Sequence, residues 1–65
     1  MTAHERHRHL LALLAEQPDI KVPELARLLG VSQPTVRSDL RALEQQGFLT
    51  RVRGGASLNG RYPHL

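Results

Sequence analysis

The feature that most constrains the fold is a pair of amphipathic segments joined at Gly30, within residues 23–44. Leu25, Leu28 and Leu29 recur at helical spacing, so the first segment is predicted to be a short helix with one apolar face. Glycine adopts the left-handed conformation after a helix at little steric cost, so this helix is expected to end at Gly30. Two short helices joined by such a turn are typical of a helix-turn-helix.

The second segment is predicted to be a helix from Ser32 to Gln46. The Ser32 side chain can cap its start, because the oxygen can accept from a backbone N–H of the first turn that has no partner within the helix. Val36, Leu40 and Leu43 stand at positions i, i+4 and i+7 and are expected to face the core. Burying this face turns a set of polar and basic side chains outward.

That outer face is predicted to be a nucleic-acid recognition surface. Arginine, glutamine and serine side chains can donate hydrogen bonds to phosphate oxygens and to base edges in a major groove. The alternative is a solvated helix face with a chance excess of positive charge. The predicted contact residues of this segment are Ser32, Gln33, Pro34, Thr35, Arg37, Ser38 and Arg41.

After the second helix the pattern changes to the alternation of a strand. Residues 49–58 alternate around Gly54 and Gly55, which predicts a β-hairpin with the glycine pair supplying positive φ angles at its turn. Arg51 and Arg53 are expected to share one face of the first strand and to reach a phosphate or an adjacent minor groove. These two arginines and two glycines complete the predicted contact set. The alternative is that the arginines only keep an edge strand soluble.

Two further elements are predicted before the helix pair. Thr2 to Glu16 is expected to form an amphipathic helix, with Thr2 as its N-cap and Glu5 as the capping-box partner. Ile20 to Val22 alternates apolar and polar residues, which predicts a short third strand of the sheet.

Length and composition limit the chain to one small domain. We assign residues 1–58 to a winged helix-turn-helix that is mainly α with a small antiparallel β-hairpin, three helices plus a β-wing, and residues 59–65 to a flexible tail or the start of a linker. Nine basic against six acidic residues give a formal net charge of +3, and a sequence pI near 10.7 favours a polyanionic partner. The chain has no cysteine and no long apolar run, so we expect a cytoplasmic protein that does not enter a membrane.

Several ionisable side chains have competing interpretations. His4, Arg6, His7, Arg8 and His9 could approach phosphates or could solvate a frayed terminus. Two histidines three residues apart do not supply the three or four convergent ligands of a metal site, so no metal is predicted. Neither a nucleophile with a base and an orienting acid nor a phosphate-cradling glycine loop is present, so we expect no enzyme activity and no cofactor.

Asp39 is a carboxylate in the middle of the helix proposed to meet a polyanion. It falls between the apolar and outer faces, within reach of Arg6, Arg37 or Arg41. A carboxylate that faced phosphate would be repelled. We therefore expect Asp39 to pair with one of these arginines and orient it, and not to touch DNA.

A series of different short motifs follows one another along most of the chain, from about Glu5-Arg6 to Ala56. The motifs are Glu24-Leu25-Ala26, Leu29-Gly30-Val31-Ser32, Thr35-Val36-Arg37, Asp39-Leu40, Leu43-Glu44, Gly47, Leu49, Arg51 and Gly54-Gly55-Ala56. This set resembles the N-terminal winged helix-turn-helix domain of the DeoR family of bacterial transcription regulators. Each motif alone is weak, but their order and intervals are specific.

The resemblance implies sequence-specific binding of double-stranded DNA by a transcription regulator, usually a repressor, with helix 32–46 in the major groove and the wing on the backbone or minor groove. It also implies a homodimer or higher oligomer, formed through a C-terminal domain that senses a phosphorylated sugar and is absent from this chain. Ser38 stands where the family commonly has a second arginine and Arg53 where a histidine is frequent, so the operator is expected to differ. A winged-helix module that binds an acidic protein partner stays open as the alternative function.

Overall fold

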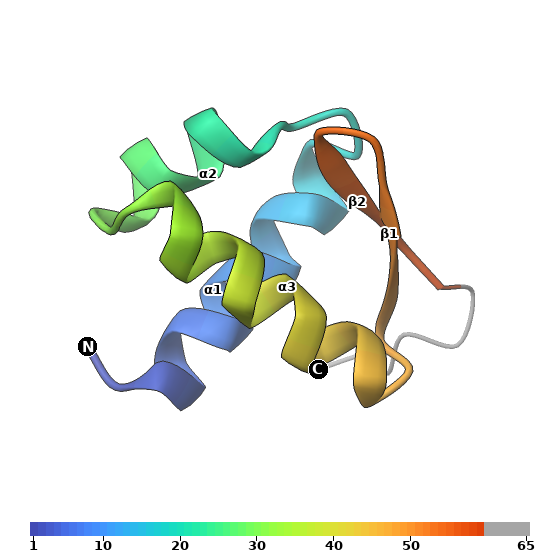
Figure 1. The fold of residues 1–65 in the computed structure, drawn as a ribbon, viewed down its shortest axis with the longest axis horizontal. Helices are drawn as coiled ribbons and strands as arrows, with labels where there is room; N and C mark the ends of the chain where they lie inside the picture. Colours follow the sequence, from blue (N-terminus) through green and yellow to red (C-terminus); the bar gives the residue numbers. More distant parts are fainter. Residues whose placement is uncertain (60–65) are drawn as a thin grey trace.

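The computed structural model describes residues 1–59 and shows three helices that pack around one core, with a hairpin beside them (Figure 1). This is the predicted winged helix-turn-helix. None of the helices in residues 1–59 combines the length and the hydropathy of a membrane-spanning segment. The elements are α1 (Ala3–Glu16), α2 (Val22–Leu29), α3 (Gln33–Gln45), β1 (Leu49–Val52) and β2 (Gly55–Leu58).

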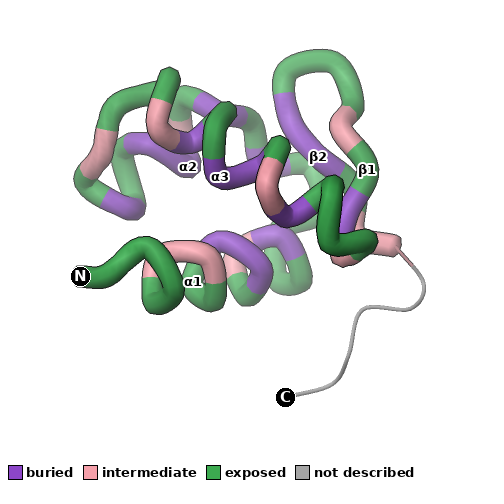
Figure 2. Tube along the Cα trace, turned by 60° about the horizontal axis from the view of Figure 1, so that its bottom comes forward, coloured by how far each residue is buried: buried purple, intermediate pink, exposed green. Residues whose placement is uncertain are grey.

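The first helix, α1, begins at the capping box that its sequence predicts. The Glu5 N–H donates to Thr2 Oγ1 at 3.1 Å, and the Thr2 N–H donates to Glu5 Oε1 at 2.8 Å. Leu10, Leu11 and Leu14 of this helix are buried in the core. In Figure 2 the buried stretches of the three helices lie where the helices face one another, whereas the hairpin tip is exposed.

The turn between α2 and α3 also has its predicted geometry. Gly30 follows α2 in the left-handed conformation, with φ 70° and ψ 32°. Ser32 then caps α3, because its Oγ accepts from the Thr35 N–H at 3.3 Å. These two residues set where α2 ends and α3 begins, and so determine which residues of α3 face the core.

The predicted apolar stripe of α2 is wrong at one position. Leu25 and Leu29 are buried, but Leu28 is 43% exposed. At 3.6 residues per turn, Val22, Leu25, Ala26 and Leu29 share one direction, and Leu28 falls on its margin. Val22 and Ala26 complete the buried face in its place. The helix also starts at Val22, one residue before the segment 23–44 in which the sequence predicted the helix pair.

The predicted third strand is reduced to a single bridge between Lys21 and Gly55. The Val22 N–H donates to the Gly54 carbonyl at 2.9 Å, and the Leu25 N–H already donates to the Lys21 carbonyl at 3.0 Å. Because the first turn of α2 begins there, the chain does not continue alongside β2. The sheet of the described residues therefore has two strands, β1 and β2, paired antiparallel.

The hairpin turn lies one residue earlier than predicted. Val52 pairs with Gly55, so the two turn residues are Arg53 and Gly54 and not the glycine pair. Of the two turn residues only Gly54 has a positive φ, at 76°, and a negative φ followed by a positive one is the order of a type II turn. Gly55 serves close packing instead, because a Cβ atom on it would lie 2.9 Å from the Ile20 carbonyl oxygen.

Asn59 was predicted to begin a flexible tail, but it is tied to the domain. Its N–H donates to the Phe48 carbonyl at 3.0 Å, its Nδ2 donates to the Gly47 carbonyl at 2.8 Å, and its Oδ1 accepts from Thr50 Oγ1 at 2.8 Å. The hairpin is thereby closed at the end opposite its turn. The rest of the predicted tail, 60–65, lies outside the described residues.

Replacing Gly55 with alanine is expected to lower the free energy of unfolding by about 1–3 kcal/mol, because the new methyl group overlaps the Ile20 carbonyl and a backbone segment must shift. Thermal unfolding followed by circular dichroism measures the change. Ser57→Ala in the same strand is the matched control, since Ser57 is exposed and should change stability little. Equal stability of both variants would show that the Ile20 segment moves away freely.

Candidate nucleic-acid interface

The orientation of α3 is the basis of the candidate interface. Val36 and Leu40 are 0% exposed and Leu43 is 2% exposed, so one side of α3 is completely buried. The opposite side is exposed, and it carries the predicted contact residues Gln33, Pro34, Arg37, Ser38 and Arg41. The predicted partition of α3 into a core face and an outer face is therefore confirmed.

The two hydroxyl residues at the start of α3, Ser32 and Thr35, hydrogen-bond to each other and help to cap the helix. Ser32 is exposed and Thr35 is half-buried. Their hydroxyls lie 3.0 Å apart, and Ser32 Oγ also caps the helix. Both remain at the surface edge where α3 begins, and a hydroxyl can donate and accept at the same time.

The exposed arginines of α3 lack carboxylate partners. Arg37 Nη2 donates to the Gln33 Oε1 at 3.3 Å, a neutral partner one turn away. Within the described part of the chain, the salt bridges join Arg6 and His7 to Asp39 and Arg27 to Glu24, and none involves Arg37 or Arg41. The positive charge of this face is therefore not neutralised from within the protein.

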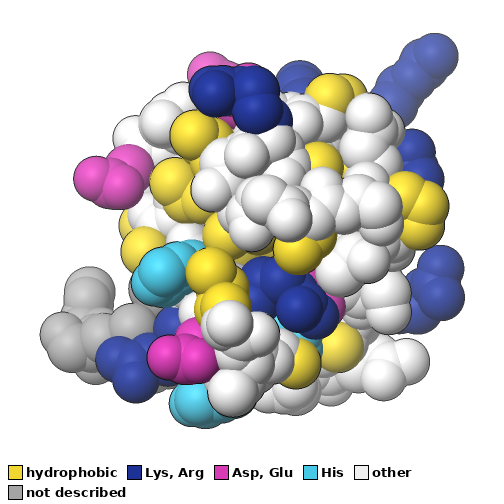
Figure 3. All heavy atoms as spheres, turned by 90° about the vertical axis from the view of Figure 1, so that its left-hand side faces the viewer, with side chains coloured by type: hydrophobic (Ala, Val, Ile, Leu, Met, Phe, Trp, Pro, Cys, Tyr) yellow, Lys and Arg dark blue, Asp and Glu magenta, His cyan; other side chains and the backbone are white. Residues whose placement is uncertain are grey.

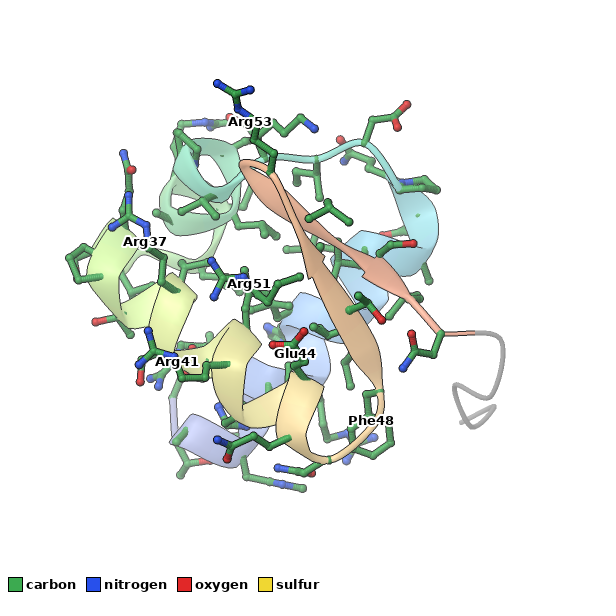
Figure 4. All side chains as sticks on the ribbon, turned by 45° about the vertical axis from the view of Figure 1, so that its right-hand side comes forward. Arg37, Arg41, Glu44, Phe48, Arg51 and Arg53 are labelled. Atoms are coloured by element: carbon green, nitrogen blue, oxygen red, sulfur yellow. The ribbon has the colours of Figure 1, made fainter. Side chains whose placement is uncertain are left out.

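The figures place basic side chains from two elements on one side of the molecule. Figure 4 shows Arg37 and Arg41 on α3, Arg51 reaching from β1 towards α3, and Arg53 pointing away at the hairpin tip. In Figure 3, Lys and Arg side chains recur along the right-hand edge of the view, where no Asp or Glu side chain is visible. Helix α3 and the hairpin thus both carry basic side chains on this side of the molecule.

The two hairpin arginines occupy different environments, contrary to the expectation that they share one strand face. Arg51 is half-buried within β1, whereas Arg53 is an exposed turn residue. The two glycines also differ. Gly54 is exposed at the tip, but Gly55 is buried against residues 20–21. We therefore leave Gly55 out of the interface, because its surface is already covered.

Asp39 forms a buried ion cluster with the N-terminal part of α1. It is 4% exposed, and it accepts from both Nε and Nη2 of Arg6, with 2.9 Å between Nη2 and Oδ1. His7 Nε2 lies 3.0 Å from the same Oδ1. The prediction that Asp39 pairs with an arginine is confirmed for Arg6, while the His7 contact was missed. Helical periodicity carried the signal for this contact, because His7 lies three, four and seven residues before the buried Leu10, Leu11 and Leu14 and so shares their face of α1.

The electrostatics of the cluster keep Asp39 ionised. Burial raises the pKa of the Asp39 carboxyl, but the hydrogen bonds from Arg6 and His7 outweigh burial, and the pKa lies below its ordinary value. Arg6 and His7 are thus engaged inside the protein, and we do not include them in the candidate interface. His4, Arg8 and His9 are exposed.

The fold and this surface define a class of protein: a winged helix-turn-helix whose second helix of the pair, α3, and hairpin carry exposed arginines. The family model of the DeoR-like helix-turn-helix domain matches residues 6–61. The chain belongs to this family.

Curated relatives named as transcription regulators match most of the chain. It is 50% identical over 56 residues to the HTH-type transcriptional repressor CsqR of Escherichia coli, covering 86% of this chain and 22% of that protein. It is 47% identical over 58 residues to the HTH-type transcriptional regulator GolR of Listeria innocua, covering 89% of this chain and 23% of that protein.

A third relative is shorter. The chain is 42% identical over 57 residues to a putative galactitol utilization operon repressor of Escherichia coli, covering 88% of this chain and 51% of that protein. The chain therefore spans between about a fifth and a half of the length of these relatives. No solved structure matched it.

Proposed function

We propose that this chain is the sequence-specific double-stranded DNA-binding domain of a bacterial transcription regulator, with α3 in the major groove and the hairpin on the adjacent backbone or minor groove. The observation that carries the proposal is the outer face of α3. Its arginines have no carboxylate partner among the described residues, and the opposite face is completely buried. A major groove about 12 Å wide admits one helix of this kind.

The proposed contacts divide by chemistry. Gln33, Arg37 and Ser38 can hydrogen-bond base edges, since their side chains are exposed near the start of α3. Arg41 lies one turn further along and can contact phosphate. The rest of the proposed contact set consists of Ser32, Pro34 and Thr35 at the helix start and Arg51, Arg53 and Gly54 on the hairpin.

We further propose that the regulator represses transcription in the cytoplasm and binds DNA as a homodimer or larger oligomer. Relatives at 50% and 42% identity are named repressors. A single module of this size buries little surface on DNA and is expected to bind weakly, whereas two modules bind half-sites one helical turn apart. We assign the pairing of modules to segments of such a regulator outside the region that this chain matches, which is 22% of the first relative.

Selection of binding sites from random-sequence duplexes, repeated at two salt concentrations, tests the proposal. We expect enrichment of one sequence, and an affinity whose logarithm falls with the logarithm of salt at a slope of about −0.9 per phosphate neutralised. Enrichment of an inverted repeat would support two-fold binding. Absence of any enriched sequence would contradict the proposal and favour a protein-interaction module with an acidic partner.

A further inference from the structure

We infer that Glu44 is a positioning residue that docks β1 onto α3 and so holds the Arg51 guanidinium in the seam between them, where it binds a phosphate of the DNA backbone. The inference rests on the proposed function, because it assumes that the basic surface meets DNA. It assigns a role to a carboxylate that the contact set leaves out, and it separates two hairpin arginines that look equivalent in the sequence.

The hydrogen bond from Arg51 to Glu44 fills a gap at the edge of the sheet. In an antiparallel hairpin, pairs that exchange two hydrogen bonds alternate with pairs that exchange none. Val52 and Gly55 close the turn, so the next pair, Arg51 and Ala56, leaves the Arg51 N–H directed away from β2. Glu44 Oε2 accepts this N–H at 3.1 Å. One carboxylate thus satisfies an edge donor and ties β1 to α3.

The Arg51 side chain is held on the α3 side of the strand. Side chains alternate along a strand, so Arg51 shares a face with Leu49, which is buried in the core. The Arg51 side chain is half-buried, and its Nε is buried without a hydrogen-bond partner in the structure of residues 1–59. Figure 4 shows the side chain extending towards the side of α3 that carries Arg37 and Arg41, with Glu44 lying apart from the guanidinium.

This arrangement makes Arg51 a prepared ligand for phosphate. The aliphatic part of the Arg51 side chain is already restricted in its rotamers, and the Nε–H is already removed from water. Folding therefore accounts for part of the entropy loss and desolvation that phosphate binding would otherwise require. The positive charge of Arg51 adds to the charges of Arg37 and Arg41. None of these three arginines forms a salt bridge with a carboxylate of the described residues. Arg53 carries the same charge but must be ordered from an exposed turn. We therefore expect Arg51→Ala to weaken DNA binding more than Arg53→Ala does.

The charge and the hydrogen bond of Glu44 have opposite effects on DNA binding and can be separated. The negative charge repels phosphate, whereas the hydrogen bond positions Arg51. Glu44→Gln removes the charge and keeps an acceptor, while Glu44→Ala removes both. The difference between these two variants therefore includes the hydrogen bond but not the charge, and the same comparison in Arg51→Ala accounts for the other differences between glutamine and alanine.

The test is a double-mutant cycle on the 65-residue chain with a fluorescein-labelled random-sequence duplex, followed by fluorescence anisotropy at one salt concentration. Glu44→Gln should bind at least as tightly as the unchanged chain. Glu44→Ala should bind about fivefold more weakly than Glu44→Gln, the effect of one net hydrogen bond. In the Arg51→Ala background the two Glu44 variants should bind equally, because Glu44 then has no guanidinium to position.

Two results would overturn the inference: equal affinities of the two Glu44 variants when Arg51 is present, or the same difference between them when Arg51 is alanine. Affinities are compared at a temperature at which circular dichroism shows every variant folded. Glu44→Met, which keeps the length of the side chain without a strong acceptor, replaces Glu44→Ala if that variant unfolds. Failure of the unchanged chain to bind any duplex would instead contradict the proposed function, so the two failures are distinguishable.

Discussion

Replacing Asp39 with asparagine is expected to lower the free energy of unfolding by about 3 kcal/mol, the lower end of the cost of breaking a buried ion pair. The change leaves the Arg6 guanidinium without a counter-ion and turns an amide group towards donors of Arg6 and His7. Arg6 has 19% of its side chain exposed, so its guanidinium can recover some hydration after the substitution. The loss of stability should therefore stay near this lower end of the range.

For a chain of 65 residues this loss is large. Total stability on the order of 0.05–0.15 kcal/mol per residue corresponds to about 3–10 kcal/mol for the whole chain. Thermal and urea unfolding measure the change. The matched control is Glu24→Gln, because the Glu24–Arg27 pair has the same chemistry on the exposed surface of α2, where ion pairs contribute little. Equal effects of the two substitutions would contradict a special role for the buried cluster.

The stability difference between the unchanged chain and Asp39→Asn is also expected to depend on pH. Since folding lowers the Asp39 pKa, its stabilising contribution is present above the unfolded-state pKa of about 3.9 and is lost as the pH falls through the folded-state value. The difference in unfolding free energy between the unchanged chain and Asp39→Asn should therefore shrink as the pH falls below about 4. A difference that does not shrink in acid would show that the carboxylate charge is not responsible.

Replacing Arg37 with alanine is expected to weaken binding to the selected DNA sequence by about 1–3 kcal/mol, or roughly 5- to 150-fold, and to relax the preference at one base pair. Arg37 is exposed on α3, and its only recorded partner among the described residues is the neutral Gln33 side chain, so its guanidinium is available to a base. Binding-site selection with the variant measures the change in preference, and anisotropy titration measures the affinity.

Arg37→Lys is the control that separates charge from hydrogen-bond geometry. Lysine keeps the positive charge but cannot form the planar, two-donor contact of a guanidinium. The lysine variant should therefore keep the salt dependence of the unchanged chain while its base preference is weakened. A uniform loss of affinity over all sequences in Arg37→Ala, with the preference intact, would reassign Arg37 to a phosphate contact.

The elements that the sequence predicted correctly depend on neighbours in the chain. The capping box at Thr2 and Glu5, the left-handed Gly30 and the Ser32 cap each involve residues within about four positions of one another. Side-chain spacing within α3 likewise predicted its outer face. The predictions were wrong where the structure of one segment depends on another segment. Ile20 to Val22 has the alternation of a strand, but α2 begins at Val22, so the pairing with β2 is limited to one bridge.

The sequence by itself determined the class of fold, the order of its helices and hairpin, and which side of α3 faces outward, because periodicity and capping are local properties of the chain. Only the tertiary structure decided that Arg6 and His7 belong to Asp39, that Gly55 is required by the Ile20 carbonyl, and that Glu44 ties β1 to α3. Each of these contacts joins segments that packing of the core brings together, and no local pattern records which partner a side chain will meet there.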